Sequence, residues 1–407
     1  MKSMNSPMKF FYSLFMQMML MVHIGCTQPG VQTSSVSKES VMRTGAEQLN
    51  AYLPLLTGKR IAIVANQTSR INGCHLVDSL KSRGVQIQCV FAPEHGFRGE
   101  QGAGEKVKNG VDTKSGIQVI SLYGKHLKPT QEDLEGIDLV MFDIQDVGAR
   151  FYTYISTLQY VMEACAEQNK MLLILDRPNP NGFYVDGPVL DTNFRSFIGM
   201  NPIPVVHGMT IGEYAKMLNG EKWLKGKKTC KIQVIPVSNY THRDLYSLPV
   251  APSPNLPNMA AVYLYPSLCF FEGTKVSVGR GTDFPFQMIG YPGFKGGDTA
   301  FRPTSIHGKA LDPPYEDSLC EGLNLREFMA SSNKKQLHLG WLIQMYRQYP
   351  NKGSFFTPFF EKLSGTEMLR KQIILGESES EIRQSWQKQL DQFKQIRKKY
   401  LLYEDFE

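Results

Sequence analysis

The chain has 407 residues, of which 42% are hydrophobic and 20% are charged, and its formal net charge is +7. This length and hydrophobic content exclude a disordered chain and suit two globular domains. The charge is only mildly positive, and no dense stripe of lysine and arginine interleaved with aromatic residues occurs, so we expect no nucleic-acid partner. A mild positive bias favours an anionic substrate or surface.

The first 25 residues have the pattern of an export signal. Lys2 and Lys9 precede the apolar run 10–21, which is too short for a transmembrane span. Residues 24–26 resemble the cleavage box of a bacterial lipoprotein, in which Cys26 becomes the lipidated first residue and anchors the protein to a membrane. An ordinary secretory signal, with Cys26 left as a free thiol, is the alternative. Removal of the signal takes away two lysines and no acids, so +7 becomes +5, and we expect a periplasmic or membrane-anchored protein of a bacterial envelope.

Continuous apolar runs and segments of helical periodicity alternate after residue 60. Such runs, separated by helices, are typical of a parallel sheet that is covered on both faces. The predicted strands are residues 60–65, 87–91, 117–122, 139–144, 171–175 and 232–237, and the predicted helices are residues 75–83, 153–167 and 210–218.

The predicted fold class is α/β, with a Rossmann-like N-terminal domain that holds a mainly parallel sheet and a smaller α+β C-terminal domain. After the signal (1–25) and a linker (26–46), we expect the Rossmann-like catalytic domain over residues 47–248. The proline-rich stretch 249–257 begins the second domain, residues 249–407, which would close the active-site cleft.

No cofactor motif accompanies the predicted strands. No GxGxxG or P-loop follows any of them, so we expect no nucleotide. His95, His126 and His207 show no metal-ligand spacing such as HExxH, and the cysteines form no CxxC pair. The sequence therefore predicts an activity without a metal or other cofactor.

Residues 93–99, Pro-Glu-His-Gly-Phe-Arg-Gly, directly follow a predicted strand. Ligands of open α/β sheets bind beyond the carboxyl ends of strands, and the proline and glycines keep this segment irregular. Glu94 is the candidate general acid at this rim, and His95 would orient it or bind substrate. The structural alternative is that Glu94 pairs with Arg98 and that His95 is an ordinary loop histidine.

Polar side chains also follow other predicted strands, where they would share one edge of the sheet. They are Asn66 after the first strand, Asp143, Gln145 and Asp146 at the fourth, and Arg177 and Asn179 after the fifth. We expect one of the two aspartates to be functional and the other structural. In the structural interpretation Asp146 caps the following helix, and Arg150 forms a buried pair with an aspartate.

A further segment, residues 271–282, is rich in glycine and small hydroxyl residues around Glu272 and Arg280. This composition indicates a loop that grips substrate. A tight hairpin with an exposed salt bridge is the alternative.

With these motifs the chain resembles the NamZ-type exo-β-N-acetylmuramidases, formerly a family of unknown function. The resemblance covers nearly everything after the signal. It implies a Rossmann-like domain, a smaller second domain and an active site between them that removes terminal, non-reducing N-acetylmuramic acid (MurNAc) from peptidoglycan fragments. The matching pieces are Asn66 with Thr68 and residues 93–96, 142–154, 176–180, 252–255 and 271–282.

The resemblance also implies roles for site residues. Glu94 would protonate the glycosidic oxygen, and Asp143 or Asp146 would hold a water, act as nucleophile, or orient the 2-acetamido group of MurNAc. The lactyl carboxylate of MurNAc calls for a cation, for which the candidates are Arg150, Arg177 and Arg280. The other candidate substrate-binding residues are Asn66, His95, Gln145, Tyr152, Asn179, Asn255 and Glu272.

Two other classes of protein compete with this interpretation. A non-catalytic lipoprotein that binds cell-wall glycans would use the same polar rim for binding without turnover. An esterase or amidase lacks support, because the sequence contains no GxSxG nucleophile elbow.

Overall fold

The computed structural model describes residues 41–99, 102, 105, 109–328 and 335–407, and residues 41–407 form one compact unit. The predicted signal, Cys26 and most of the predicted linker lie outside the described residues. The packed fold begins before the predicted linker end at residue 46, because Arg43 N–H donates to Ser238 O and Gly45 N–H donates to Asp176 O. No helix in the described part of the chain is both long and apolar enough to cross a membrane.

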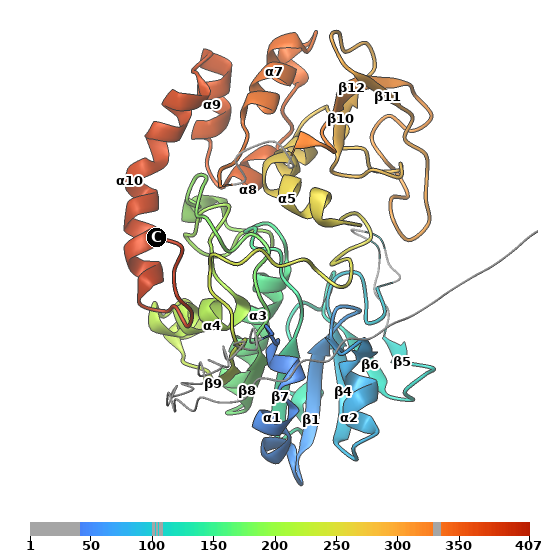
Figure 1. Ribbon diagram of the computed structural model, residues 1–407, viewed down its shortest axis with the longest axis vertical. Coiled ribbons are helices and arrows are strands. Elements are labelled where there is room, and N and C mark those ends of the chain that lie inside the picture. Colours follow the sequence, from blue (N-terminus) through green and yellow to red (C-terminus); the bar gives the residue numbers. More distant parts are fainter. Residues whose placement is uncertain (1–40, 100–101, 103–104, 106–108, 329–334) are drawn as a thin grey trace, which may run out of the picture. The chain divides into compact units, whose positions relative to one another are not determined.

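A seven-stranded sheet with the strand order β5-β6-β4-β1-β7-β8-β9 forms the N-terminal layer (Figure 1). Every pairing in it is parallel except that of β5 with β6. The prediction of a mainly parallel α/β sheet is therefore confirmed. The strands are β1 (Arg60–Ala65), β4 (Gln86–Ala92), β5 (Gly110–Val111), β6 (Gln118–Ser121), β7 (Leu139–Asp143), β8 (Met171–Leu175) and β9 (Lys231–Ile235), with a small ladder of β2 (Arg70–Ile71) and β3 (Cys74–His75) beside them.

The apolar runs form central strands because both faces of the sheet are buried. In β1, Ile61 and Ile63 belong to one hydrophobic core and Ala62 and Val64 to the other, as the two-residue period of a strand requires. The first core is covered by α1 (Leu49–Leu56) and α2 (Leu76–Lys81), and the second by α3 (Tyr154–Glu167) and α4 (Ile211–Gly220).

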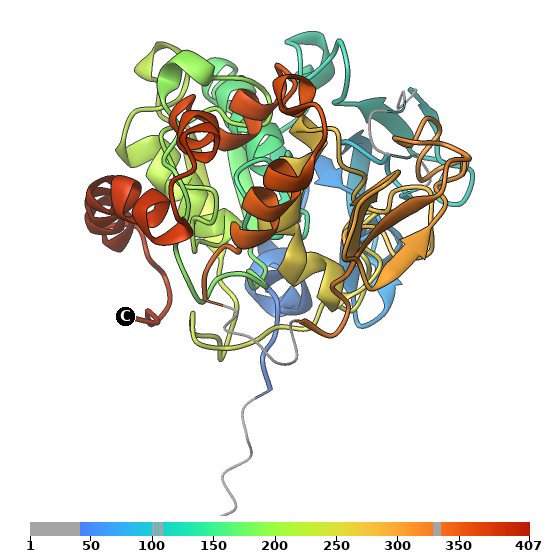
Figure 2. The same cartoon turned by 90° about the horizontal axis from the view of Figure 1, so that it is seen from above.

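The C-terminal region combines a three-stranded antiparallel sheet, in the order β10-β12-β11, with helices. Residues 241–258, which contain neither helix nor strand, lead into it. In Figure 2 this sheet (orange) lies to the right of the helices that follow residue 340 (red). The elements are α5 (Met259–Leu268), β10 (Met288–Tyr291), β11 (Thr299–Phe301), β12 (Cys320–Asn324), α7 (Gly340–Gln348), α8 (Phe360–Ser364), α9 (Met368–Leu375) and α10 (Glu379–Lys398). Short 3-10 helices connect the larger elements: η1 (Gly45–Glu47), η2 (Glu132–Leu134), η3 (Thr192–Phe194), η4 (Lys225–Lys227), η5 (Cys269–Gly273) and η6 (Lys352–Ser354).

Helix α10 carries the chain back to the N-terminal layer, where it ends beside α4 (Figure 1). The buried Arg397 guanidinium donates to Gly208 O and pairs with Asp405 at 2.8 Å. Tyr403 donates to Oδ2 of Asp176, the residue directly after β8, at 2.6 Å. These buried charge-assisted contacts hold the C-terminal segment against the sheet edge that carries the candidate site.

Candidate active site

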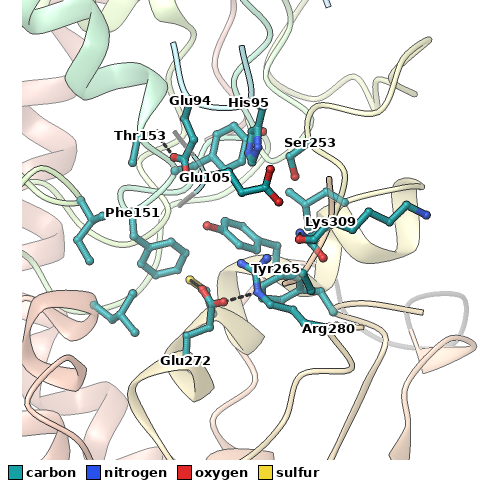
Figure 3. Close-up of a pocket in the computed structure, with 18 of the residues that line it drawn as sticks. Glu94, His95, Glu105, Phe151, Thr153, Ser253, Tyr265, Glu272, Arg280 and Lys309 are labelled. Carbon is teal, nitrogen blue, oxygen red and sulfur yellow. Dashed lines mark hydrogen bonds and ion pairs between the residues drawn. The ribbon is translucent and has the colours of Figure 1, made fainter. Parts of the chain in front are cut away.

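A cavity of about 600 Å³ opens beyond the carboxyl ends of the strands and has walls from both regions of the chain. Glu94 and His95 follow β4, Tyr123 follows β6, and residues 151–153 follow β7 on the N-terminal side. Residues from α5, η5 and the loops around β10 and β11 form the opposite wall (Figure 3). No group of three or more His, Cys, Asp or Glu side chains within the described ranges is arranged to hold a metal ion.

Two hydroxyl groups fix the carboxyl group of Glu94 at the cavity wall. Tyr123 donates to Glu94 Oε1 at 2.9 Å. Thr153 donates to Oε2 at 2.9 Å (Figure 3). His95 and Gly96 follow with φ of 70° and 76°, so the chain turns sharply just after Glu94. This left-handed turn ends the extended strand and lets the carboxyl group face the cavity.

Arg98 forms ion pairs with two aspartates and not with Glu94, which was the structural alternative for Glu94. Its guanidinium contacts Asp112 at 2.7 Å and Asp78 at 3.1 Å. It also lies over the ring of Phe97, 4.4 Å from the centroid. Arg98 therefore stabilises the segment that follows Glu94.

Asp143 and Arg177 form a buried ion pair outside the cavity wall. Arg177 donates from Nε to Asp143 Oδ1 at 2.6 Å and from Nη2 to Oδ2 at 2.9 Å. Asp143 is fully buried and Arg177 is 4% exposed. This bidentate pair joins the ends of β7 and β8. Neither side chain lines the cavity, so Asp143 does not reach it for the predicted catalytic role, nor Arg177 for the predicted contact with substrate.

Arg150 does not line the cavity, so the prediction that it binds substrate there is wrong. The alternative, a buried pair with an aspartate, is not formed among the described residues either. Its guanidinium donates to three backbone carbonyls, those of Pro188, Ile203 and Leu363, each at 2.8 Å. Gly365, with φ of 72°, packs so closely that a Cβ there would lie 2.7 Å from Arg150 Nη2. Arg150 thus connects loops of the N-terminal layer to α8.

Asp146 is buried behind the cavity wall, and it does not cap α3, whose N-cap residue is Thr153. Its Oδ2 accepts from Gly148 N–H at 2.7 Å, while Oδ1 meets no donor in the described part of the chain. Burial raises the pKa of Asp146 to about 7. Its neighbour His207, 3.9 Å away, is neutral because burial and the charge of Arg397 lower the pKa of His207 to about 3.

The raised pKa of Asp146 makes a testable contribution to stability. Between its ordinary value and about pH 7, the folded chain keeps a proton that the unfolded chain has lost, so this group lowers stability as the pH rises through that interval. Asn cannot ionise, so we expect Asp146→Asn to be more stable than the wild type at pH 8 by about 1–3 kcal/mol. Urea unfolding at pH 4.5, 6 and 8 measures the difference, which should shrink toward low pH. Asp391→Asn on the exposed face of α10 is the control, and an equal gain at pH 4.5 would contradict the assignment.

Asn66, Gln145 and Asn179 form a hydrogen-bonded layer beneath the cavity rather than its wall. Asn66 donates to Tyr154 OH at 2.9 Å, and Asn179 donates to Met209 O at 2.9 Å. Gln145 donates to the backbone oxygens of residues 146 and 178, both at 2.8 Å. These amides hold the loops that follow the strands. In the sequence, a polar residue that holds such a loop cannot be told from one that binds a ligand.

Four of the other predicted residues do line the cavity: Tyr152, Asn255, Glu272 and Arg280. Arg280 Nε donates to Glu272 Oε1 at 2.6 Å (Figure 3), and its guanidinium lies 5.0 Å from the centroid of the Phe286 ring. The terminal nitrogens of Arg280 make no hydrogen bond to any residue that the structure describes. Of the three candidate arginines, Arg280 is the one whose guanidinium can receive an anionic ligand in the cavity.

The structure adds cavity residues that the sequence interpretation missed. Tyr123 could have been found, because it follows a predicted strand in the same way as Glu94 does. Glu105, Lys309 and Asp312 lie in loops far from any strand end and carry no recognisable pattern. The aromatic and apolar members of the wall include Phe151, Phe197, Ile198, Leu256, Tyr265, Phe286, Leu311, Phe359 and Leu363.

Both regions of the chain match models of one protein family. Residues 61–260 match the N-terminal model and residues 263–403 the C-terminal model of exo-β-N-acetylmuramidase NamZ. The peptidoglycan β-N-acetylmuramidase NamZ of Bacillus subtilis (strain 168) is 37% identical over 392 residues, covering 91% of this chain and 93% of that relative. The chain belongs to the NamZ family. As a NamZ-family protein it is a glycoside hydrolase, which confirms the predicted family and enzyme class.

Solved structures related to this NamZ-family chain share its fold. A DUF1343 family protein from Bacteroides fragilis NCTC 9343 has a TM-score of 0.83 and 47% sequence identity, covering 90% of this chain and 100% of that one. A second DUF1343 family protein from the same organism has a TM-score of 0.76 and 29% identity, covering 89% of this chain and 99% of that one.

Proposed function

We propose that this chain is an exo-acting enzyme that releases terminal, non-reducing β-MurNAc from peptidoglycan fragments, with Glu94 as the general acid. The observation that carries the proposal is the carboxyl group of Glu94, held by two hydroxyls at the wall of a cavity of about 600 Å³. Membership of the NamZ family supports the substrate class. Walls of aromatic rings and a few polar groups suit a sugar, whose faces are apolar and whose edges carry hydroxyls.

The hydroxyl partners of Glu94 suit an acid that changes protonation state. A hydroxyl group can donate or accept, so Tyr123 and Thr153 can rotate their protons when Glu94 gains or loses its own. The carboxyl group therefore keeps its position through both states. In the proposed reaction Glu94 transfers its proton to the glycosidic oxygen as the bond to the anomeric carbon breaks.

The function is tested by incubating the purified chain with the MurNAc-GlcNAc disaccharide and measuring free sugars by mass spectrometry. We expect MurNAc and GlcNAc in equal amounts, and from longer glycans that begin with MurNAc we expect release of that one sugar only. Binding of the disaccharide without any release would refute the proposed activity and favour the glycan-binding alternative.

In this proposal Arg280 binds the lactyl carboxylate and makes the enzyme prefer MurNAc-GlcNAc to substrates without the lactyl group. A charge-assisted hydrogen bond contributes about 1.5–3 kcal/mol, so we expect Arg280→Gln to raise KM for MurNAc-GlcNAc by about 10–100-fold. Cleavage of a GlcNAc-GlcNAc disaccharide, which lacks the lactyl group, should change much less. Steady-state kinetics on both substrates measure the preference.

The matched control for Arg280 is Glu272→Gln, which disrupts the same ion pair but keeps the guanidinium in the cavity. This variant should keep the preference for the lactyl-bearing substrate. If Arg280→Gln keeps it as well, another group binds the lactyl carboxylate.

A further inference from the structure

Glu105 lines the cavity, although no sequence motif singled it out. In Figure 3 its carboxyl group points into the cavity, between Glu94 and Tyr265. Oε1 of Glu105 is buried, and no donor among the described residues reaches it. A buried acceptor without a donor costs about 1–3 kcal/mol, so this position favours a ligand or water that supplies an N–H or O–H group.

Glu105 and Gly102 lie close to each other and to the loop between β11 and β12. Glu105 N–H donates to Gly102 O at 3.2 Å. A Cβ on Gly102 would lie 2.6 Å from Glu105 Oε1 and 3.1 Å from the backbone nitrogen of Lys309, which lies in the loop between β11 and β12. This close approach limits the positions that the Glu105 carboxyl group can take.

The other carboxylates near the cavity are less suited to accept a proton from a reacting group. Glu272 is paired with Arg280 at 2.6 Å, so its carboxyl group already has a cationic partner. Asp312 is exposed at the rim, and Asp146 lies behind the wall. Glu105 has a buried carboxyl oxygen at the cavity wall, and no ion pair joins it to a cationic side chain among the described residues.

We propose that Glu105 is the second catalytic residue, which accepts a proton from the nucleophile while Glu94 protonates the leaving group. This inference rests on the proposed function. The bond between the anomeric carbon and the glycosidic oxygen breaks, and that oxygen takes the proton of Glu94. The oxygen of a water molecule bonds to the anomeric carbon, and this water gives a proton to Glu105. Solvent then carries a proton from Glu105 back to Glu94.

The 2-acetamido oxygen of MurNAc is the alternative nucleophile for the same base. In that route Glu105 takes the amide proton as the oxygen bonds to the anomeric carbon and the leaving group departs. It returns the proton when water opens the resulting ring. Proton NMR of the first-formed MurNAc separates the routes, because direct attack by water gives the α-anomer and participation of the acetamide gives the β-anomer.

The experiment compares Glu105→Gln and Glu94→Gln on two substrates, MurNAc-GlcNAc and an aryl β-MurNAc glycoside whose leaving group needs little protonation. We expect Glu105→Gln to lower kcat by about 100-fold or more on both substrates, with KM nearly unchanged. Glu94→Gln should spare the aryl glycoside far more than the disaccharide. Glu135→Gln, at an exposed site remote from the cavity wall, is the control.

Azide separates a catalytic from a structural role for Glu105. Azide is an anionic nucleophile that needs no proton acceptor, so it should restore turnover of the aryl glycoside by Glu105→Ala about 10-fold or more and yield a glycosyl azide. Failure of azide to restore turnover in a folded Glu105→Ala variant overturns the proposal, as does a Glu105→Gln kcat within about fivefold of the wild type on both substrates. Either result leaves the proposed function standing if the wild type releases MurNAc, whereas absence of release by the wild type refutes that function.

Discussion

Glu94→Gln is expected to lower kcat for MurNAc-GlcNAc by about 10²–10⁴-fold, the range that general acid catalysis contributes. Glutamine has nearly the same shape and can keep hydrogen bonds to Tyr123 and Thr153, one as acceptor and one as donor. It has no proton to transfer to the glycosidic oxygen. We therefore expect a loss in kcat with little change in KM or in the free energy of unfolding.

The leaving group provides the sharper measurement for Glu94. The loss should be smaller for an aryl glycoside, whose phenolate departs with little protonation, than for the disaccharide. Kinetics on both substrates, with Glu135→Gln as the exposed control, check this difference. Equal losses on the two substrates would show that Glu94 has a role other than proton donation, and near-normal activity on the disaccharide would exclude it from catalysis.

Asp143→Asn is expected to destabilise the fold by about 3–5 kcal/mol, because it leaves the guanidinium of Arg177 buried without a counter-charge. Both residues are almost completely buried and neither lines the cavity. The variant should therefore lose free energy of unfolding while the folded fraction keeps kcat close to the wild type. Urea unfolding and kinetics on the same preparation measure the two effects.

The double variant Asp143→Leu with Arg177→Met is the matched control for this ion pair. Replacing both charges with apolar groups of similar size removes the unpaired charge, so it should recover much of the lost stability. If Asp143→Asn instead keeps its stability and loses kcat, Asp143 takes part in catalysis, as its place at the end of β7 first suggested.

The sequence was sufficient to predict the sheet and the edge that carries the site. In β1, β7 and β8 the apolar runs are continuous, and only a parallel sheet covered on both faces buries all of their side chains. The motif that contains Glu94 directly follows β4, and the chain turns there at His95 and Gly96. Local pattern alone therefore located Glu94.

Which polar residues face the cavity depends on contacts that form only in the folded chain. Three charged residues have the types and the spacing of a binding site: Asp143, Arg150 and Arg177. In the folded chain Asp143 and Arg177 neutralise each other, and Arg150 donates to backbone oxygens such as that of Leu363. Glu105 and Arg280 reach the cavity because two regions of the chain close around it. Local apolar periodicity and turn residues were enough to predict the strands, the edge of the sheet that carries the site, and the position of Glu94. Only the folded structure assigned the partners of each charge, because burial and hydrogen bonding there are set by segments that meet only after folding.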